Sequence, residues 1–185
     1  MNETLNVIKR RCSVRSFLEK QVPDEALQAI LEAGSCAPYA QEYTRHFTVV
    51  QNKALIDRLS EEAKAAAVLM DVPHLAALGQ KKEYHCLYQA PTVILISAKE
   101  KSVAPESDCA AAIENMLIAA QSLEIESCWI YFTILAFLSP TGAALREVFK
   151  IPDGYNPSAS VALGYAKEAA KSSLCESSSG VTYIY

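Results

Sequence analysis

The stretch from Ser107 to Phe132 constrains the fold more than any other part of the chain. After a polar start it carries apolar residues with few interruptions up to Leu123. On a helix with 3.6 residues per turn, these positions cover far more than one stripe, so the helix must be packed on several sides. The sequence then becomes rich in aromatic and β-branched residues, which indicates a buried strand. We therefore expect a central helix that leads into an interior strand.

Composition limits the class of protein. The chain has 185 residues, of which 51% are hydrophobic, so we expect one domain over residues 1–185 with a substantial core. The net charge of −4 argues against nucleic-acid and anionic-membrane partners, although a local basic cluster could still bind a phosphate. No apolar signal region or bilayer-length apolar run is present, so we expect a cytoplasmic protein.

The cysteines do not form a recognisable motif. All six stand singly, without a C-x-x-C pair and without a histidine at metal-ligand spacing. We therefore expect reduced thiols, mostly in the core, and no metal site.

The rest of the pattern predicts an α+β fold in which helices flank a mixed sheet. Pro23 and two acidic residues open the second helix, and Gly34 is expected to end it as a left-handed cap. Ser139 is expected to cap a later helix whose first residue is Pro140. The expected helices are 2–10, 24–34, 53–70, 107–123 and 140–150, and the expected strands are 46–51, 90–97, 127–132, 158–165 and 181–184.

Two segments are harder to interpret. Residues 71–89 hold a proline, a glycine and two of the three histidines, and could form a lid or a short helical insertion. Residues 167–180 are rich in Ala and Ser without an apolar period, so an irregular arm is expected there. The strand expected at 181–184 could pair with a sheet edge in the same subunit or in another.

The segment from Arg11 to Phe17 is a candidate phosphate site. If it is extended, Arg11, Ser13 and Arg15 project to one side. Two guanidinium groups that flank a hydroxyl can bind a phosphate, because arginine matches phosphate oxygens in pairs. From these three residues alone, a solvated basic loop is the alternative and the commoner outcome.

Other polar residues give weaker indications. Cys86 follows His85, but adjacent residues on a helix or strand point apart, so a packing role is favoured over a nucleophilic pair. We expect His46 to pack or cap at the start of a strand. Asn115 is expected to have a structural role within the central helix.

Four separated pieces together resemble the FMN-dependent nitroreductase family of the small homodimeric type. They are R-C-S-V-R at 11–15, A-P-Y-A ahead of H-F-T-V-V, D-C-A-A-A-I-E-N-M-L-I-A-A-Q-S-L with S-C-W-I, and S-V-A-L-G-Y. They occur in order over almost the whole chain. The resemblance implies a homodimer that holds two FMN molecules at its interface, each touching both subunits.

The resemblance also implies which residues contact FMN. The phosphate and ribityl chain would be held by the early clamp, and Lys171 would close on the same phosphate. The strand end at 129–132 would lie behind the flavin ring, and the loop at 38–41 would reach it from the other subunit. The full set is Arg11, Cys12, Ser13, Arg15, Pro38, Tyr39, Ala40, Gln41, Trp129, Ile130, Tyr131, Phe132 and Lys171.

This chain departs from the family pattern at five positions. Cys12 and Cys175 stand where basic residues are usual, and Tyr39 replaces a small residue. Glu124 and Glu126 occupy positions that are normally Gly in the turn before the strand. A non-Gly residue with positive φ costs on the order of 1 kcal/mol, and two carboxylates would disfavour a reduced flavin anion.

The implied function is an FMN-dependent oxidoreductase that passes electrons from NADH or NADPH to a nitroaromatic, a quinone or another electron-poor acceptor by a ping-pong mechanism. No catalytic side chain is expected, because the flavin N5 carries the chemistry. The acceptor would lie among Tyr39, Tyr131 and the 71–89 region. Two alternatives are a flavin-binding homodimer with little turnover, for storage or sensing, and a structural dimer that has lost FMN.

Overall fold

A four-stranded sheet forms the centre of the computed structural model, which describes residues 2–41, 44–168 and 180–185. The strands lie in the order β1 (Arg45–Val50), β2 (Thr92–Lys99), β4 (Tyr155–Gly164) and β3 (Glu126–Ile130). All three neighbouring pairs are antiparallel. In the described part of the chain, the parallel element of the sheet is an isolated bridge between Ser13 and Ser127. The α+β class with helices on both faces is confirmed.

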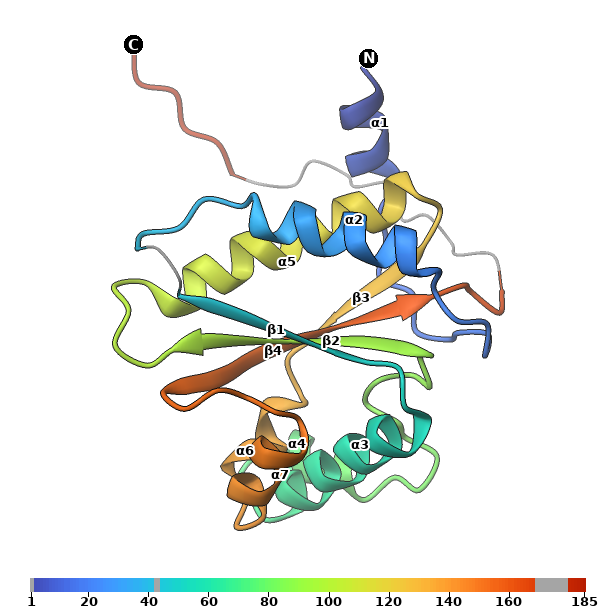
Figure 1. The fold of residues 1–185 in the computed structure, drawn as a ribbon, viewed down its shortest axis with the longest axis vertical. Helices are drawn as coiled ribbons and strands as arrows, with labels where there is room; N and C mark the ends of the chain where they lie inside the picture. The colour runs from blue at the N-terminus through green and yellow to red at the C-terminus, as the bar shows by residue number, and fades with distance from the viewer. Residues whose placement is uncertain (1, 42–43, 169–179) are drawn as a thin grey trace.

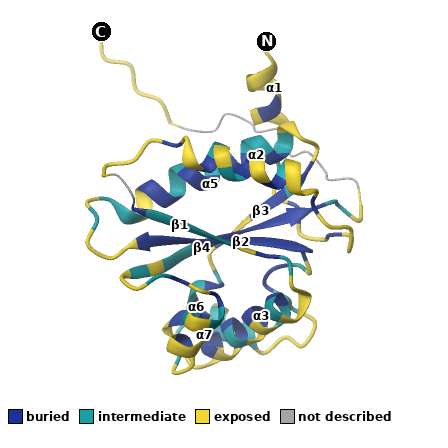
Figure 2. Ribbon diagram, viewed as in Figure 1, coloured by how far each residue is buried: buried dark blue, intermediate teal, exposed yellow. Residues whose placement is uncertain are grey.

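Helices cover both faces of the sheet, as Figure 1 shows. One layer holds α2 (Asp24–Ser35) and α5 (Pro105–Ser122), with α1 (Glu3–Arg10) beyond them, and the other holds α3 (Lys53–Val68), α4 (Pro73–Gly79), α6 (Ile134–Leu138) and α7 (Gly142–Val148). Ile94 and Ile96 of β2 pack toward α2 and α5, whereas Val93 and Leu95 pack toward α3 and α7. Burial on both faces explains the nearly continuous apolar sequence of this strand (Figure 2).

Helix α5 is the long helix expected from the sequence, and it packs on the sheet and on α2. The Nδ2 of Asn115 donates to the carbonyl of Ala33 at 3.0 Å, so the structural role expected for Asn115 is confirmed. The surface of α5 is covered less completely than predicted, because Ala111 and Ile118 remain partly exposed in a single chain.

Gly34 does not end α2 in a left-handed conformation, so that prediction is wrong. It lies inside the helix, and the cap residue Cys36 has φ −74°. A Cβ at position 34 would collide with the side chain of Met116 on α5. Gly34 is therefore needed for the close approach of the two helices rather than for a turn.

The turn between α5 and β3 is a Schellman motif. Glu124 has φ +58°, Ile125 N–H donates to the carbonyl of Ala120 at 2.9 Å, and Glu124 N–H donates to that of Gln121 at 3.3 Å. The strained position expected at Glu124 is thus present. Glu126 lies in β3 and has no positive φ, because the turn needs only one left-handed residue.

One helix start and one short helix differ from the prediction. The helix expected from Pro140 begins at Gly142, because the Ser139 hydroxyl bonds the carbonyl of Ala136 instead of capping. The five-residue α6 was not predicted. Residues 71–89 contain a short helix, α4, that packs on α3, which is the second of the two alternatives given for this segment.

The C-terminal strand expected at 181–184 is not formed. Residues 180–185 pair with no strand in this single chain, and Tyr183 and Ile184 are 72% and 94% exposed. A strand needs a partner edge, and none lies against this segment here. No helix in the described ranges is both long and apolar enough to cross a membrane.

Candidate functional site

The candidate phosphate clamp is an extended segment that lies beside the edge strand β3. Val14 N–H donates to the carbonyl of Ser127 at 3.0 Å, and Ser13 forms the parallel bridge with the same residue. Val14 is buried, whereas Ser13 and Arg15 are exposed. The alternation predicted for an extended segment is therefore present.

Cys128 of β3 lies within electrostatic range of the clamp. Burial raises the pKa of the Cys128 thiol, while the Arg15 charge, a hydrogen bond with Ser13 and the Arg11 charge act in the opposite direction. The Nε atom of Arg11 lies 3.7 Å from Glu114 Oε1 on α5.

Arg15 also lines an open pocket of about 270 Å³, which we call the Arg15 pocket. A second cation, Lys167, lines it from the segment after β4, and its N–H donates to the carbonyl of Ser16 at 3.1 Å. Lys167 was not predicted as a site residue, although it is the first cation after the last core strand. Lys171 and Cys175 lie outside the described residues.

The opposite wall of the Arg15 pocket comes from the turn after α4. This wall consists of Glu83, Tyr84, His85, Tyr88 and Gln89, none of which was singled out as a cofactor contact from the sequence. Residues 71–89 were expected beside the acceptor, and this part of them lines the same pocket as Arg15 and Lys167.

The aromatic end of β3 offers exposed ring faces. Trp129 is 40% and Tyr131 64% exposed, whereas Ile130 is buried. Phe132 is partly buried and makes an edge contact with Tyr84, the ring centroids lying 5.6 Å apart. Tyr131 lines a different pocket, of about 220 Å³, near the start of α5.

The loop at 38–41 is held at the beginning of α5. Asp108 Oδ1 accepts from Ala40 N–H at 2.9 Å and its Oδ2 accepts from Thr44 Oγ1 at 3.1 Å, while the Arg45 guanidinium lies 5.4 Å from the centre of the Tyr39 ring. The clamp lies near the other end of α5, beside the start of β3 (Figure 1). A single chain therefore does not bring the loop and the clamp together.

A half-buried carboxylate lies next to the clamp. Burial raises the pKa of Glu126. Burial and the Glu126 charge also raise the pKa of Cys12, against the effect of Arg11. Glu126 therefore places a carboxylate close to Cys12 within the clamp segment.

The surroundings of the other candidate residues indicate structural roles. Cys86 is fully buried, and burial raises its pKa to about 12, so it is not a nucleophile at neutral pH. His46 packs edge-on against the ring of Tyr155, with centroids 6.1 Å apart, as expected. In the described ranges, no group of three His, Cys, Asp or Glu residues could hold a metal ion.

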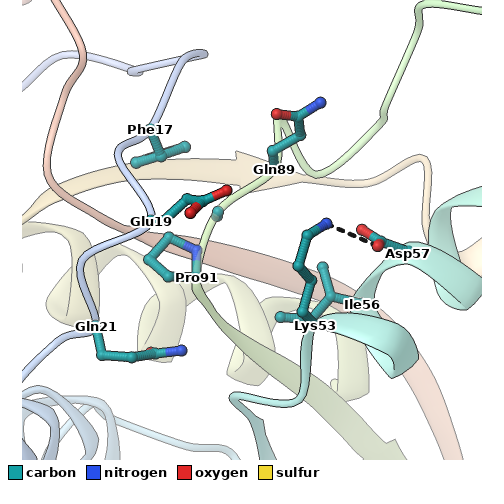
Figure 3. Close-up of a pocket in the computed structure, with 9 residues that line it drawn as sticks. Phe17, Glu19, Gln21, Lys53, Ile56, Asp57, Gln89 and Pro91 are labelled. Carbon is teal, nitrogen blue, oxygen red and sulfur yellow. Dashed lines mark hydrogen bonds and ion pairs between the residues drawn. The ribbon is translucent and has the colours of Figure 1, made fainter.

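A second pocket, of about 240 Å³, adjoins the Arg15 pocket. Lys53 Nζ bonds Asp57 Oδ2 at 2.8 Å on one side of it, and Phe17, Ile56 and Pro91 supply apolar surface (Figure 3). Gln89 lines both pockets. The backbone at Gln89 therefore influences the shape of both.

Comparison with known proteins agrees with this geometry. The model of the nitroreductase family matches residues 8–165. The chain belongs to the nitroreductase family. The matched range includes the clamp, the loop at 38–41, α5 and β3 of this nitroreductase, whereas Lys167 lies just beyond it.

Solved structures and a curated relative resemble this nitroreductase over its length. A nitroreductase with bound FMN from Bacteroides fragilis is 39% identical, with a TM-score of 0.92 and full coverage of both chains. A nitroreductase with bound FMN from Desulfitobacterium hafniense is 30% identical, with a TM-score of 0.91 and the same coverage. A relative from Archaeoglobus fulgidus, named provisionally as an NADH dehydrogenase/NAD(P)H nitroreductase, is 32% identical over 91% of this chain and 88% of its own.

Proposed function

We propose that this protein is an FMN-dependent oxidoreductase that takes electrons from NADH or NADPH and passes them to an electron-poor acceptor, such as a nitroaromatic or a quinone. The observation that carries the proposal is that the clamp segment bridges the edge strand β3 of a nitroreductase sheet, while Arg15 and Lys167 line one pocket. The bound FMN of two similar structures and the NAD(P)H in the relative's name support it.

The clamp and the Arg15 pocket fit a phosphate. Arg15 and Lys167 line one opening, and Ser16 lies between them in the same wall. Ser13 and Arg15 are exposed, so their donors are free to reach a ligand from solvent. Arginine binds phosphate oxygens in pairs and lysine adds a point charge, so this donor set suits the FMN phosphate.

The end of β3 fits a flat ring. Trp129 and Tyr131 expose large aromatic surfaces next to the strand edge along which the clamp runs. A ring that covers these surfaces would remove apolar area from water and exclude water from its own face. We assign Arg11, Ser13, Arg15 and Lys167 to the phosphate end, and residues 129–132 to the ring.

A homodimer would bring the loop and the clamp together. The loop lies near the start of α5 and the clamp near its end, so two copies that pack antiparallel along α5 would place the loop of one beside the clamp of the other. The partly exposed Ala111 and Ile118 on α5, with the exposed Leu5 and Ile8 on α1, offer apolar surface for this contact. Pro38, Tyr39, Ala40 and Gln41 would then act across the interface.

The chemistry that FMN supplies when bound is acceptance of a hydride from a reduced nicotinamide and its return to an acceptor, in a ping-pong cycle. The side chains of this protein bind FMN and orient it. The clamp fixes the phosphate end, and the aromatic residues fix the ring plane. We assign no side chain to proton transfer.

Arg15→Ala tests the phosphate clamp, with Arg10→Ala as the matched control. Arg10 is exposed at the end of α1 and does not line the Arg15 pocket. Its replacement should therefore leave FMN affinity nearly unchanged. Loss of a charged hydrogen-bond donor should weaken FMN binding by on the order of 1.5–3 kcal/mol, which is roughly 10- to 150-fold. Titration of flavin fluorescence measures both variants, and equal losses would exclude the assignment.

The spectrum and mass of the purified protein separate the alternatives. We expect visible flavin absorption and a mass of twice the 20.2 kDa of one chain. Anaerobic bleaching by NADH or NADPH, followed by recovery with a quinone, is expected for the oxidoreductase. Bound flavin without bleaching would indicate storage or sensing, and failure to bind added FMN would indicate a structural dimer.

A further inference from the structure

His85 lies in the turn after α4, and both of its ring nitrogens have hydrogen-bond partners. Nε2 lies 3.2 Å from Asp57 Oδ1, and Gln89 N–H donates to Nδ1 at 3.1 Å. A backbone N–H can only donate, so Nδ1 must carry the lone pair and Nε2 the hydrogen. The two contacts therefore define a neutral His85 with one tautomer.

The hydrogen bond from Gln89 N–H to His85 closes a turn whose backbone is strained. Tyr88 and Gln89 are consecutive non-Gly residues with φ of +53° and +56°. Such residues stay in the left-handed region only where surrounding contacts hold them. His85 is fixed on α3 through Asp57, so its Nδ1 can hold Gln89 in place.

The strained turn shapes the wall that faces Arg15 and Lys167. His85, Tyr88 and Gln89 all line the Arg15 pocket, and Gln89 also borders the neighbouring pocket (Figure 3). A change of conformation at Gln89 would therefore move the wall of the site to which we assign the FMN phosphate.

We propose that His85 is a positioning residue, which holds the Tyr88–Gln89 turn against the Arg15 pocket and releases it when protonated. Protonation puts a hydrogen on Nδ1, so that two N–H donors face each other and the bond to Gln89 is lost. The contact with Asp57 is kept, because a protonated ring still donates from Nε2. The effect on the turn does not depend on the proposed function, whereas the effect on FMN binding rests on it.

The groups around His85 set the direction of the pH dependence. Burial lowers the pKa of His85 from its ordinary 6.5, against the hydrogen bond and charge of Asp57. The turn bond is therefore present at neutral pH and is lost as the pH falls through this lowered pKa. The titratable and charged groups near the ring are Lys53, Asp57 and Glu61 on α3, Arg15 and Lys167 across the pocket, and Glu83, Tyr84 and Tyr88 on its own turn.

Two substitutions separate the two ring nitrogens. His85→Asn places an oxygen acceptor near Nδ1 and loses the contact with Asp57, whereas His85→Gln keeps a donor near Nε2 and loses the acceptor for Gln89. Both remove the titrating group. His85→Asn is thus the conservative variant for the turn, and His85→Gln is its matched counterpart.

The first measurement is hydrogen exchange of the Gln89 amide by NMR, on the full chain with and without FMN. At pH 7.5 we expect protection in the wild type and in His85→Asn, and exchange roughly two- to tenfold faster in His85→Gln, the range for one hydrogen bond. As the pH falls through the lowered pKa of His85, the wild type should approach His85→Gln, whereas His85→Asn should keep its protection after correction for intrinsic exchange.

The second measurement is FMN affinity over the same pH range. We expect His85→Gln to bind FMN roughly two- to tenfold more weakly at pH 7.5, and the wild type to approach it in acid. The phosphate itself titrates near pH 6, but equally for all three proteins, so the difference between the wild type and His85→Asn isolates His85.

The two measurements fail in distinguishable ways. Equal Gln89 exchange in the two variants, or a wild type without pH dependence, would overturn the positioning role. If the exchange pattern is as expected but none of the three proteins binds FMN, the positioning role of His85 is supported and the proposed function fails. If FMN binds equally to all three despite the exchange pattern, the coupling to the pocket is refuted.

Discussion

Replacing Glu124 with Gly should stabilise the protein, although Glu124 contacts neither core cluster. Glu124 has φ +58° at the end of α5, a conformation that costs an L-residue roughly 1–2 kcal/mol. Glycine removes this cost but loses about 0.5–1 kcal/mol through the freedom that it gains in the unfolded chain. The conformational gain is therefore about 0.7 kcal/mol, within a range of roughly 0–1.5 kcal/mol.

The charge of Glu124 makes a second contribution. It lies at the C-terminal end of α5, where the helix dipole disfavours a carboxylate by about 0.3–1 kcal/mol at low ionic strength. Glu124→Gln removes only this charge, so it should raise the free energy of unfolding by only about 0.3–1 kcal/mol. This gain should fall as salt is added. Glu124→Gly should gain both contributions, or roughly 1–2 kcal/mol.

Thermal and urea unfolding measure the effect, at one protein and one FMN concentration because binding shifts stability. For a chain of this size, we expect the midpoint of Glu124→Gly to rise by roughly 2–8 °C. Glu126→Gly is the control, since Glu126 lies in β3 without a positive φ, and it should lose about 0.5–1 kcal/mol. A Glu124→Gly midpoint no higher than that of Glu124→Gln would refute the argument from backbone strain.

Two further changes test the site and the helix packing. Glu126→Gln should tighten FMN binding by roughly two- to fivefold in low salt, because a screened carboxylate no longer opposes the phosphate. The difference from the wild type should shrink as the pH falls through the raised pKa of Glu126, and fluorescence titration that finds equal affinities at neutral pH would count against it. Gly34→Ala should cost roughly 1–3 kcal/mol in urea unfolding, because its Cβ meets the side chain of Met116, and it should cost less in a chain that already carries Met116→Ala. Simple additivity of those two changes would contradict the packing explanation.

Several elements could be predicted because their signals are local. The apolar run of β2 reports burial on both faces, and the long apolar stretch before Leu123 reports α5. The clamp segment was treated as an extended segment from its sequence, and in the structure Val14 is buried between the exposed Ser13 and Arg15. Helix ends were less certain, because Ser139 had two partners available and bonded Ala136 instead of capping.

The site depended on contacts that no local pattern reports. Lys167 reaches the Arg15 pocket because its backbone bonds Ser16 beside the sheet, far away in the sequence. His85 appeared in the sequence only as the neighbour of Cys86, and its importance comes from Asp57 on another helix.

The sequence by itself determined the long helices and the core strands, since these preferences act over a few residues and depend on periodicity. The tertiary structure alone decided which charges meet, where the loop at 38–41 lies relative to the clamp, and why position 34 must be glycine. The physical reason is that such contacts follow from sheet register and helix packing, which bring together residues that are distant in the chain and share no local signal.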